Sequence, residues 1–391
     1  MSFDTPIPRT GTHCSKWDMM ETLYGLSPQT ALPMWVADMD FRPPAAVQAA
    51  LQKMLDHGVY GYFGDDRAYL AAIRWWMETR HGWSPEPSHI FTTHGLVNGT
   101  ALCVDAFTQP GDAVVLMTPV YHAFARVIRG AGRSVTECPL SVVNGRHAID
   151  TAAWEACLTG REKMLILCSP HNPGGRVWTL SELQAVAEFC RRHNLILVSD
   201  EIHADLVFPG GPKHIPMAMA VPEIADRLVM MTAATKTFNI AGAHTGNVII
   251  ADEALRKTFA ARMNAMGISP NAFGMAMVTA AYSPEGAAWV DDLMRYLDGN
   301  RRLFDDAVNA LPGLRSMPLE ATYLAWVDFT GTGMTRDEIV ARVEKQAAIA
   351  TNYGEAFGTG GEHHLRFNLA MPRAMVAEAV ARLQRAFGDL Q

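Results

Sequence analysis

Residues 231–246 read MTAATKTFNIAGAHTG, and the residue at the centre of this segment is Lys236. The segment follows residues 227–230 (RLVM), a mostly apolar run that predicts a buried strand, and it contains the bend-prone residues 239–242 (NIAG). A lysine at the end of a buried strand is held by rigid neighbours and is partly desolvated. Both conditions suit an amine that forms a Schiff base with an aldehyde. The alternative is an ordinary surface lysine in a loop, so the rest of the chain must decide between the two.

The composition is that of a globular protein with a sizeable core. Of the 391 residues, 49% are hydrophobic and 19% are charged, and this length is enough for two domains. The net charge of −7 offers no basic excess for phosphates, so we expect neither nucleic acid nor an anionic membrane as a partner. The sequence shows no apolar run of about 18 residues and no signal peptide. The six cysteines form no CxxC pair and no short Cys/His cluster, so we expect a cytoplasmic protein without a metal site.

Short apolar runs alternate with helical patterns over residues 89–250. They predict strands at 90–93, 113–117, 134–138, 163–168, 195–199, 227–232 and 246–250. Helices are predicted at 44–57, 67–81 and 179–193. Such alternation is typical of an α/β fold with a mostly parallel central sheet and helices on both faces.

The pattern changes beyond residue 251, where helices are predicted at 252–266, 271–282, 284–311 and 335–347, and strands at 323–329 and 364–370. We therefore expect three parts. Residues 1–45 form an N-terminal segment that packs with the smaller domain, residues 46–284 form the large domain, and residues 285–391 form a smaller α+β domain. Residues 1–30 are expected to be irregular, because prolines and glycines interrupt any periodicity there.

Several candidate site residues come directly after predicted strands: Gly95, Tyr121, Asn172, Asp200, His203 and Lys236. In a parallel sheet, ligands bind beyond the carboxyl ends of the strands. The shared position of these residues therefore predicts that they meet at one edge of the sheet.

An aldehyde cofactor with a phosphate group, such as pyridoxal 5′-phosphate, needs an amine, a carboxylate and backbone N–H groups from its protein. Lys236 could bind the aldehyde, and Asp200 could keep the pyridine nitrogen protonated. Gly95 and Leu96 open a predicted helix, whose free N–H groups and dipole suit a phosphate. Each residue also has an ordinary interpretation, since strand-end aspartates often close turns and a glycine at a helix start is common.

Three further residues could contact the cofactor ring. Tyr121 could stack on the ring or belong to the core. Asn172, in the segment SPHNPGG, could bind the ring oxygen or simply form a turn. His203 would face the same way as Asp200 on a short helical turn, where it could hold Asp200, hold the ring oxygen or be a structural histidine.

Two more features point to a ligand with charged groups. Arg366 is a charge within the apolar residues 364–369 (HLRFNL), and it could clamp a substrate carboxylate with its forked guanidinium. Its alternative is an edge-strand arginine that reaches out to solvent. Residues 58–64 (GVYGYFG) could offer a tyrosine hydroxyl to a phosphate across a subunit interface, or their aromatic rings could simply pack.

With these residues, the chain resembles fold-type I pyridoxal-phosphate enzymes of the class I/II aminotransferase superfamily, and above all the branch of cystathionine β-lyase-type carbon–sulfur lyases. The matching segments span nearly the whole chain in the family's order: LPMWVADMDF (32–41), YGYF (60–63), PVYHAF (119–124), SPHNPGGRVW (169–178), VSDEIHADLVF (198–208), TKTFNIAG (235–242), EATYLAWVDF (320–329) and LRFNLAMPR (365–373).

The resemblance implies a role for each matching residue. Lys236 would be the Schiff-base lysine, Asp200 the partner of the pyridine nitrogen and Asn172 the contact to the ring hydroxyl. Tyr121 would stack on the ring, and Arg366 would clamp the substrate carboxylate.

The resemblance also extends to the substrate and to a second subunit. Val36 and Ala37 would bind substrate. Tyr62, with Tyr60 as the second choice, would reach the phosphate in the neighbouring subunit, which implies a homodimer with shared sites. His203 stands where many aminotransferases carry a tyrosine, and a histidine there fits the lyase-like branch.

Two departures concern the phosphate and the substrate pocket. His244 stands where many aminotransferases place a phosphate-binding arginine, so phosphate binding would rely on Thr235 and the helix start at Gly95. Residues 351–354 (TNYG) differ from the serine-proline-glycine pattern common before the arginine clamp.

The sequence leaves three functions open. The first is a β-lyase that converts cystathionine or a related cysteine S-conjugate into pyruvate, ammonia and a thiol. The second is an aminotransferase that moves an amino group from an L-amino acid to a 2-oxo acid, since both reactions use the same residues. The third is a regulator that keeps the fold without catalysis, which the filled lysine, aspartate and arginine positions disfavour.

Overall fold

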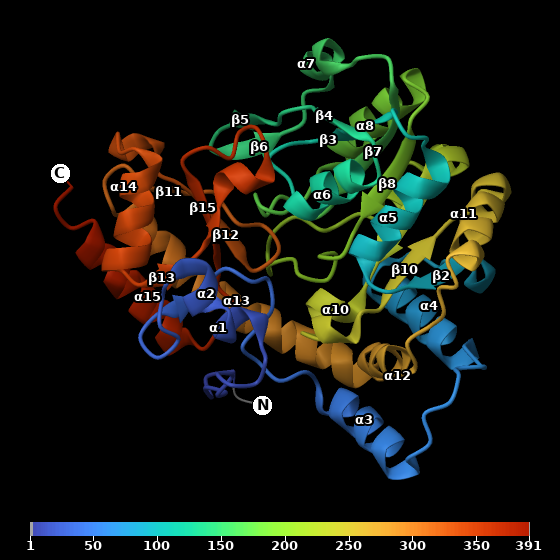
Figure 1. Cartoon of the computed structure of the whole chain (residues 1–391), viewed down its shortest axis with the longest axis horizontal. Helices are drawn as coiled ribbons and strands as arrows, with labels where there is room; N and C mark the ends of the chain where they lie inside the picture. Colours follow the sequence, from blue (N-terminus) through green and yellow to red (C-terminus); the bar gives the residue numbers. More distant parts are fainter. Residues whose placement is uncertain (1–2, 391) are drawn as a thin grey trace.

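The computed structural model describes residues 3–390, and a seven-stranded sheet forms its larger part (Figure 1). Every neighbouring pair in this sheet is parallel except those made by β10, which runs antiparallel to both of its neighbours. The predicted mostly parallel sheet is therefore confirmed. In spatial order the strands are β2 (Ile90–Thr93), β10 (Gly246–Ile249), β9 (Leu228–Thr232), β8 (Ile196–Asp200), β7 (Glu162–Cys168), β3 (Ala113–Leu116) and β4 (Ser134–Glu137).

Helices cover both faces of this sheet because its strands are apolar on both sides. Neighbouring residues on β3 show this, since Val114 packs into one apolar cluster and Val115 into the other. The first cluster lies under α5 (Leu96–Phe107), α6 (His122–Gly130) and α11 (Glu253–Ala265), and the second lies under α8 (Leu180–Arg192). Thr179 caps α8 in a reciprocal pair with Glu182.

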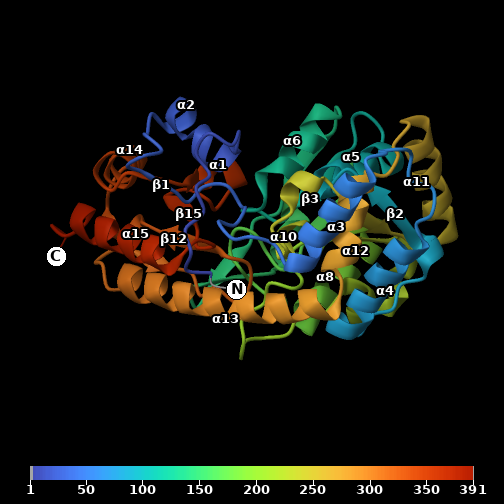
Figure 2. The same ribbon diagram turned by 90° about the horizontal axis from the view of Figure 1, so that it is seen from below.

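The C-terminal part contains an antiparallel sheet of β11 (Arg315–Ser316), β12 (Leu324–Asp328), β15 (His364–Asn368) and β14 (Asn352–Tyr353), in that order. Helix α15 (Arg373–Ala386) packs with α13 (Pro284–Asn309), which runs beneath both parts of the molecule in Figure 2. Strand β1 (Leu32–Pro33) pairs with β13 (Ile349–Ala350), so the N-terminal segment joins the C-terminal sheet region. This pairing carries residues 35–37 to the edge of the large sheet.

The remaining helices agree with the predicted ranges: α3 (Ala45–His57), α4 (Arg67–His81) and α12 (Ala272–Ala281). Short helical turns lie at α7 (Thr151–Trp154), α9 (Met217–Ala220) and α10 (Ala234–Thr237). No helix within residues 3–390 is long and apolar enough to cross a membrane.

The sequence analysis is wrong about the N-terminal residues, does not foresee a change of helix type within 335–347 and misses one hairpin. The N-terminal residues expected to be irregular contain α1 (Ser15–Asp18) and α2 (Met20–Tyr24), and Gly25 in the left-handed conformation ends the second helix. The helix expected over 335–347 stops at Val340 (α14, Arg336–Val340) and continues as a wider π-helical turn. A hairpin of β5 (Ser141–Val143) and β6 (Arg146–Ala148) was not predicted, although its Asn-Gly turn with positive φ at both residues is a strong hairpin signal.

Candidate active site

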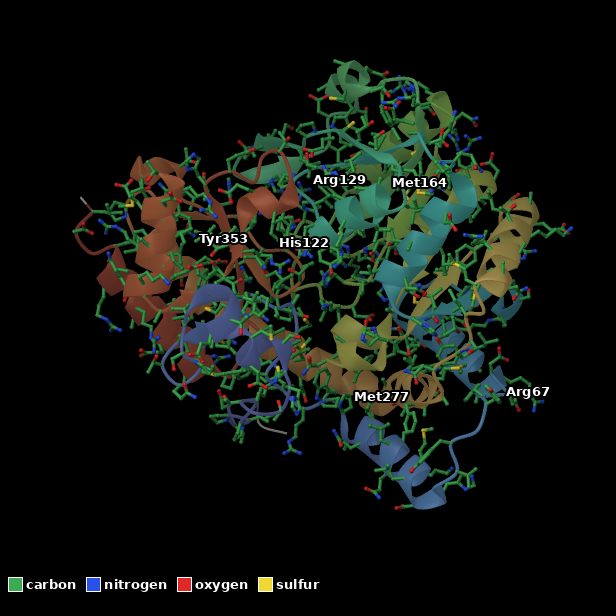
Figure 3. The ribbon with its side chains drawn as sticks, viewed as in Figure 1. Arg67, His122, Arg129, Met164, Met277 and Tyr353 are labelled. Carbon is green, nitrogen blue, oxygen red and sulfur yellow. The ribbon has the colours of Figure 1, made fainter. Side chains whose placement is uncertain are left out.

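A cavity of about 400 Å³ lies at the carboxyl edge of the large sheet, where the N-terminal segment and the C-terminal part meet that sheet. All but one of the predicted site residues line it: Val36, Ala37, Gly95, Leu96, Tyr121, Asn172, Asp200, His203, Thr235, Lys236 and Arg366. The exception is Tyr62, which is fully exposed in the loop between α3 and α4. Figure 3 shows His122, another lining residue at the start of α6, on the side of the large part that faces Tyr353 of the C-terminal part.

The topology explains why residues far apart in sequence meet here. Asp200 is the last residue of β8 and pairs in register with Met231 of the neighbouring β9. Lys236 follows β9 on the single turn of α10, so the lysine sits on a helical turn rather than in an open loop. The two side chains therefore leave adjacent strands at the same edge.

Lys236 is partly open to the cavity and otherwise surrounded by protein. Its Nζ atom donates a hydrogen bond to the carbonyl oxygen of Ala37. Burial lowers the pKa of this amine to about 8, although the nearby Asp38 opposes the shift. About a tenth of the amine is thus neutral at pH 7, far more than for an ordinary lysine, and the neutral form is the one that a nucleophile or base requires.

Asp200 is a buried acid without a cation. One oxygen accepts the backbone N–H of Ile202 at 3.1 Å, and no Lys, Arg or His within residues 3–390 forms an ion pair with the carboxylate. Burial raises the pKa of Asp200 to about 7. This carboxyl group fits a ligand that brings a positive charge, such as a protonated pyridine nitrogen.

His203 does not hold Asp200, so that part of the prediction is wrong. Its Nδ1 atom is buried and has no hydrogen-bond partner in the described part of the chain, while its ring meets Tyr323 edge-on at 6.3 Å. Burial, together with the charges of Lys236 and Arg366, lowers the pKa of His203 to about 3. The ring is therefore neutral and its free nitrogen suits the oxygen of a bound ring, the second of the predicted roles.

Arg366 lies on β15 between β12 and β14, so it is a buried residue of a central strand rather than an edge-strand arginine. Its guanidinium donates to Asn172 Oδ1 at 2.9 Å, to Asn352 Oδ1 at 2.5 Å and to the Trp35 carbonyl at 3.1 Å.

The guanidinium of Arg366 still lacks an anion. It forms no ion pair with any residue that the structure describes, and its Nε atom has no hydrogen-bond partner there. Burial lowers the pKa of Arg366 to about 10. A buried guanidinium with an unused N–H is suited to a carboxylate from the cavity.

The other end of the cavity suits a phosphate. Gly95 adopts φ +81° before α5, a conformation that glycine takes without strain. The N–H groups of the first helical turn have no partner within the helix and face an anion with the helix dipole behind them. Thr235 and the exposed His244 line the same cavity. No group of three or more His, Cys, Asp or Glu residues between residues 3 and 390 could hold a metal ion.

The N-terminal segment is fastened over the site by polar contacts. The Asn239 side chain accepts the Met39 N–H at 2.8 Å and donates to the carbonyls of Met39 and Phe41. Behind this segment Asp40 and the fully buried Lys16 form an ion pair at 2.7 Å.

The sequence analysis did not name Asn239, Asn352, His122 or Tyr323 as site residues, although it noted the NIAG bend and the TNYG segment. Only Asn239 had a local signal, since asparagine tolerates the left-handed conformation (φ +55°) that it adopts in the NIAG bend. The other three reach the site through tertiary contacts that leave no pattern in the sequence.

Comparison with known proteins agrees with this geometry. The chain matches the family "aminotransferase class I and II" over residues 36–383. Cystathionine beta-lyase PatB of Bacillus subtilis is 39% identical over 389 residues, which cover 99% of this chain and 100% of that protein. Protein MalY of Escherichia coli is 31% identical over 98% of both chains. The crystal structure of cystalysin from Treponema denticola, which contains a pyridoxal 5′-phosphate cofactor, has a TM-score of 0.94 at 34% identity and covers 100% of this chain and 99% of that one. The chain therefore belongs to the class I and II aminotransferase family.

Proposed function

We propose that this protein is a pyridoxal 5′-phosphate-dependent carbon–sulfur β-lyase that converts cystathionine or a related cysteine S-conjugate into pyruvate, ammonia and a thiol. The cofactor assignment rests on one observation: a reactive amine, an acid without a cation and a guanidinium without an anion line a single cavity. The choice of reaction rests on the similarity to PatB along the full chain.

The cofactor would be held at both of its ends. Lys236 would bind the aldehyde carbon, and Asp200 would face the pyridine nitrogen, where the buried carboxylate gains the cation it lacks. Tyr121 and Asn172 would contact the ring, and His203 would donate or accept a hydrogen bond at the ring oxygen.

The phosphate of the cofactor would lie at the start of α5. Gly95 and Leu96 supply N–H groups there, and Thr235 supplies a hydroxyl. When bound, the cofactor supplies an electron sink that stabilises negative charge at the substrate Cα.

The protein's own part in the reaction starts with the substrate carboxylate. The Arg366 guanidinium would bind it, while the N–H groups of Val36 and Ala37, which donate to no residue that the structure describes, face the same cavity. The Lys236 amine, once displaced from the aldehyde by the substrate, would take the proton from Cα. A pKa of about 8 lets this amine act as a base near neutral pH. Loss of the proton allows the Cβ–S bond to break and the thiolate to leave, and the released aminoacrylate is hydrolysed by water to pyruvate and ammonia.

The assembly proposed for this chain is a homodimer with shared sites. Four apolar or aromatic residues of the loop after α3 are exposed: Val59, Tyr60, Tyr62 and Phe63. Such a patch supports a protein contact. Tyr60 already packs against Phe273 at 5.4 Å, which leaves Tyr62 as the ring free to reach a neighbouring subunit.

Two further expectations belong to the proposed function. The lining of the cavity supports the three-part division at residues 45 and 284, because each of the three parts contributes residues to it. All six cysteines are free thiols, which supports a reducing, cytoplasmic location.

The test is to purify the protein with its cofactor and to confirm that the visible absorbance of lysine-bound cofactor disappears in Lys236→Ala. L-cystathionine is then added without any keto acid. Sustained release of pyruvate, ammonia and thiol would establish the lyase. A single-turnover loss of the aldehyde absorbance, restored only by a keto acid, would instead establish an aminotransferase.

A further inference from the structure

The carbonyl oxygen of Ala37 accepts hydrogen bonds from two side chains that come from different parts of the chain. Tyr323 donates its hydroxyl to this oxygen at 2.9 Å, and Lys236 donates its Nζ–H to the same atom. Tyr323 precedes β12 in the C-terminal part, Ala37 belongs to the N-terminal segment and Lys236 lies on α10 of the large part. The proposed function assigns no role to the tyrosine.

The oxygen is held firmly between its two donors. Asn368 donates to the carbonyls of Val36 and Asp38 on either side of Ala37, at 2.6 Å each, so the backbone cannot rotate freely. The tyrosine is equally fixed, since it is 1% exposed and its own carbonyl accepts the N–H of Leu369 at 2.8 Å.

A shared acceptor changes how strongly it holds each donor. An oxygen that already accepts a tyrosine O–H is a weaker acceptor for a second donor. A charged donor gains most from a strong acceptor, so the protonated form of the lysine loses more by this sharing than the neutral amine does. At the same time the bond fixes one N–H of the lysine against the N-terminal segment, and the rest of the nitrogen remains open to the cavity that Lys236 lines.

We infer that Tyr323 is a positioning residue for Lys236: it shares the Ala37 oxygen and thereby orients the amine while limiting the stabilisation of its protonated form. Since the use of Lys236 as a base rests on the proposed function, the test begins with a property of the cofactor-free protein that exists whatever the reaction is.

Removal of the tyrosine hydroxyl should shift the pKa of Lys236 in a predictable direction. In Tyr323→Phe the whole acceptor capacity of the Ala37 oxygen passes to Lys236, which favours the ammonium form and raises the pKa of the amine. The other charged or titratable groups that act on Lys236 stay in place: Asp38 from the N-terminal segment, Asp200 and His203 after β8, and Arg366 from β15. The variant should fold, because the oxygen keeps one donor and the phenylalanine keeps the ring contacts.

The first measurement is the pKa of Lys236 in cofactor-free protein labelled with ¹³C and ¹⁵N at the lysine side chains. The chain has seven lysines, and the signal of Lys236 is the one absent from Lys236→Ala. Tyr323→Phe should raise this pKa by about half a unit to one unit, the size of one net hydrogen bond. Tyr69→Phe is the matched control, since Tyr69 is equally buried and donates to Asn247, and it should leave the Lys236 pKa unchanged.

The second measurement uses the holoenzyme, in which the acidic limb of the kcat profile against pH should move upward by the same amount in Tyr323→Phe. An unchanged or lowered Lys236 pKa in the cofactor-free variant would overturn the inference, and so would a raised pKa without any movement of the kcat limb. If wild-type holoenzyme eliminates no thiol at all, the proposed function fails while the cofactor-free measurement still decides whether Tyr323 positions the amine.

Discussion

Replacing Arg366 with leucine should remove most of the enzyme's affinity for amino-acid substrates. Two nitrogens of the guanidinium are tied to protein oxygens, but Nε is unused and buried beside the cavity. A substrate carboxylate can therefore accept from Nε, and to complete a forked pair it must replace the Asn352 or Trp35 oxygen at Nη2, both of whose N–H groups already donate. Hydrogen bonds to charged groups contribute about 1.5–3 kcal/mol each, so the pair is worth about 3–6 kcal/mol. We expect kcat/KM to fall about 10²- to 10⁴-fold.

The assay compares two ligands that differ only in the carboxylate. L-norvaline and butylamine are each titrated into wild-type holoenzyme and into Arg366→Leu, and binding is followed by the cofactor absorbance. The variant should lose most of its affinity for L-norvaline and little of its affinity for butylamine. The difference between the two losses isolates the contact between the guanidinium and the carboxylate.

Two results would refute this reasoning. If butylamine binding fell as much as L-norvaline binding, Arg366 would act by supporting the cavity wall through Asn172 and Asn352 rather than by binding the carboxylate. If kcat/KM fell less than about tenfold, some other group would hold the carboxylate. Thermal unfolding of the variant separates either result from simple loss of the fold.

Substitutions at three more positions test the site through stability. The pKa of Asp200 in the folded protein is raised above its usual range, so the cofactor-free protein loses stability as the pH rises toward 7. In urea unfolding, Asp200→Asn should therefore stabilise the protein little near pH 4 and by about 2–4 kcal/mol above pH 7. An equal gain at both pH values would contradict this. Asn239→Ala should lower the free energy of unfolding by about 2–3 kcal/mol, because it removes the hydrogen bonds to Met39 and Phe41. Asn239→Gly should lower it less, because glycine adopts φ +55° without strain. Equal losses of stability in the two variants would exclude a backbone contribution. Gly95→Ala should cost about 1–2 kcal/mol from its φ of +81° alone, since a Cβ there meets open space, and an unchanged urea midpoint would show that the loop relaxes.

The large sheet and the place of the site could be predicted because they depend on local patterns. The apolar runs that end at Asp200 and before Lys236 identify two strands, and parallel strands deliver their last residues to one edge. The capping box at Thr179 and the glycine before α5 are equally local signals. Lys236 and Asp200 could be predicted as site residues from the positions of the strand ends alone.

Contacts between distant segments could not be predicted in the same way. The sequence left Arg366 between a carboxylate clamp and an edge-strand arginine, and its burial appears only when β14 pairs with β15 on its open side. Tyr323 and Ala37 are separated by 286 residues, and their shared hydrogen bond depends on the pairing of β1 with β13. His203 was placed beside Asp200 by helical spacing, whereas the chain there forms only a short turn.

The free protein carries an electrostatic imbalance that identifies its ligand. Asp200 and Arg366 have opposite charges and line the same cavity, yet they form no ion pair with each other or with any oppositely charged residue in the described part of the chain. Burial costs free energy at both groups, raising the pKa of the acid and lowering that of the guanidinium. A ligand that relieves both costs must bring a cation to Asp200, an anion to Arg366 and an electrophile to Lys236 between them. An amino acid alone supplies the anion but no electrophile, and a pyridoxal cofactor alone supplies the cation and the electrophile but no carboxylate. The cavity is therefore completed only by the two together, which is the composition that the first step of either candidate reaction requires.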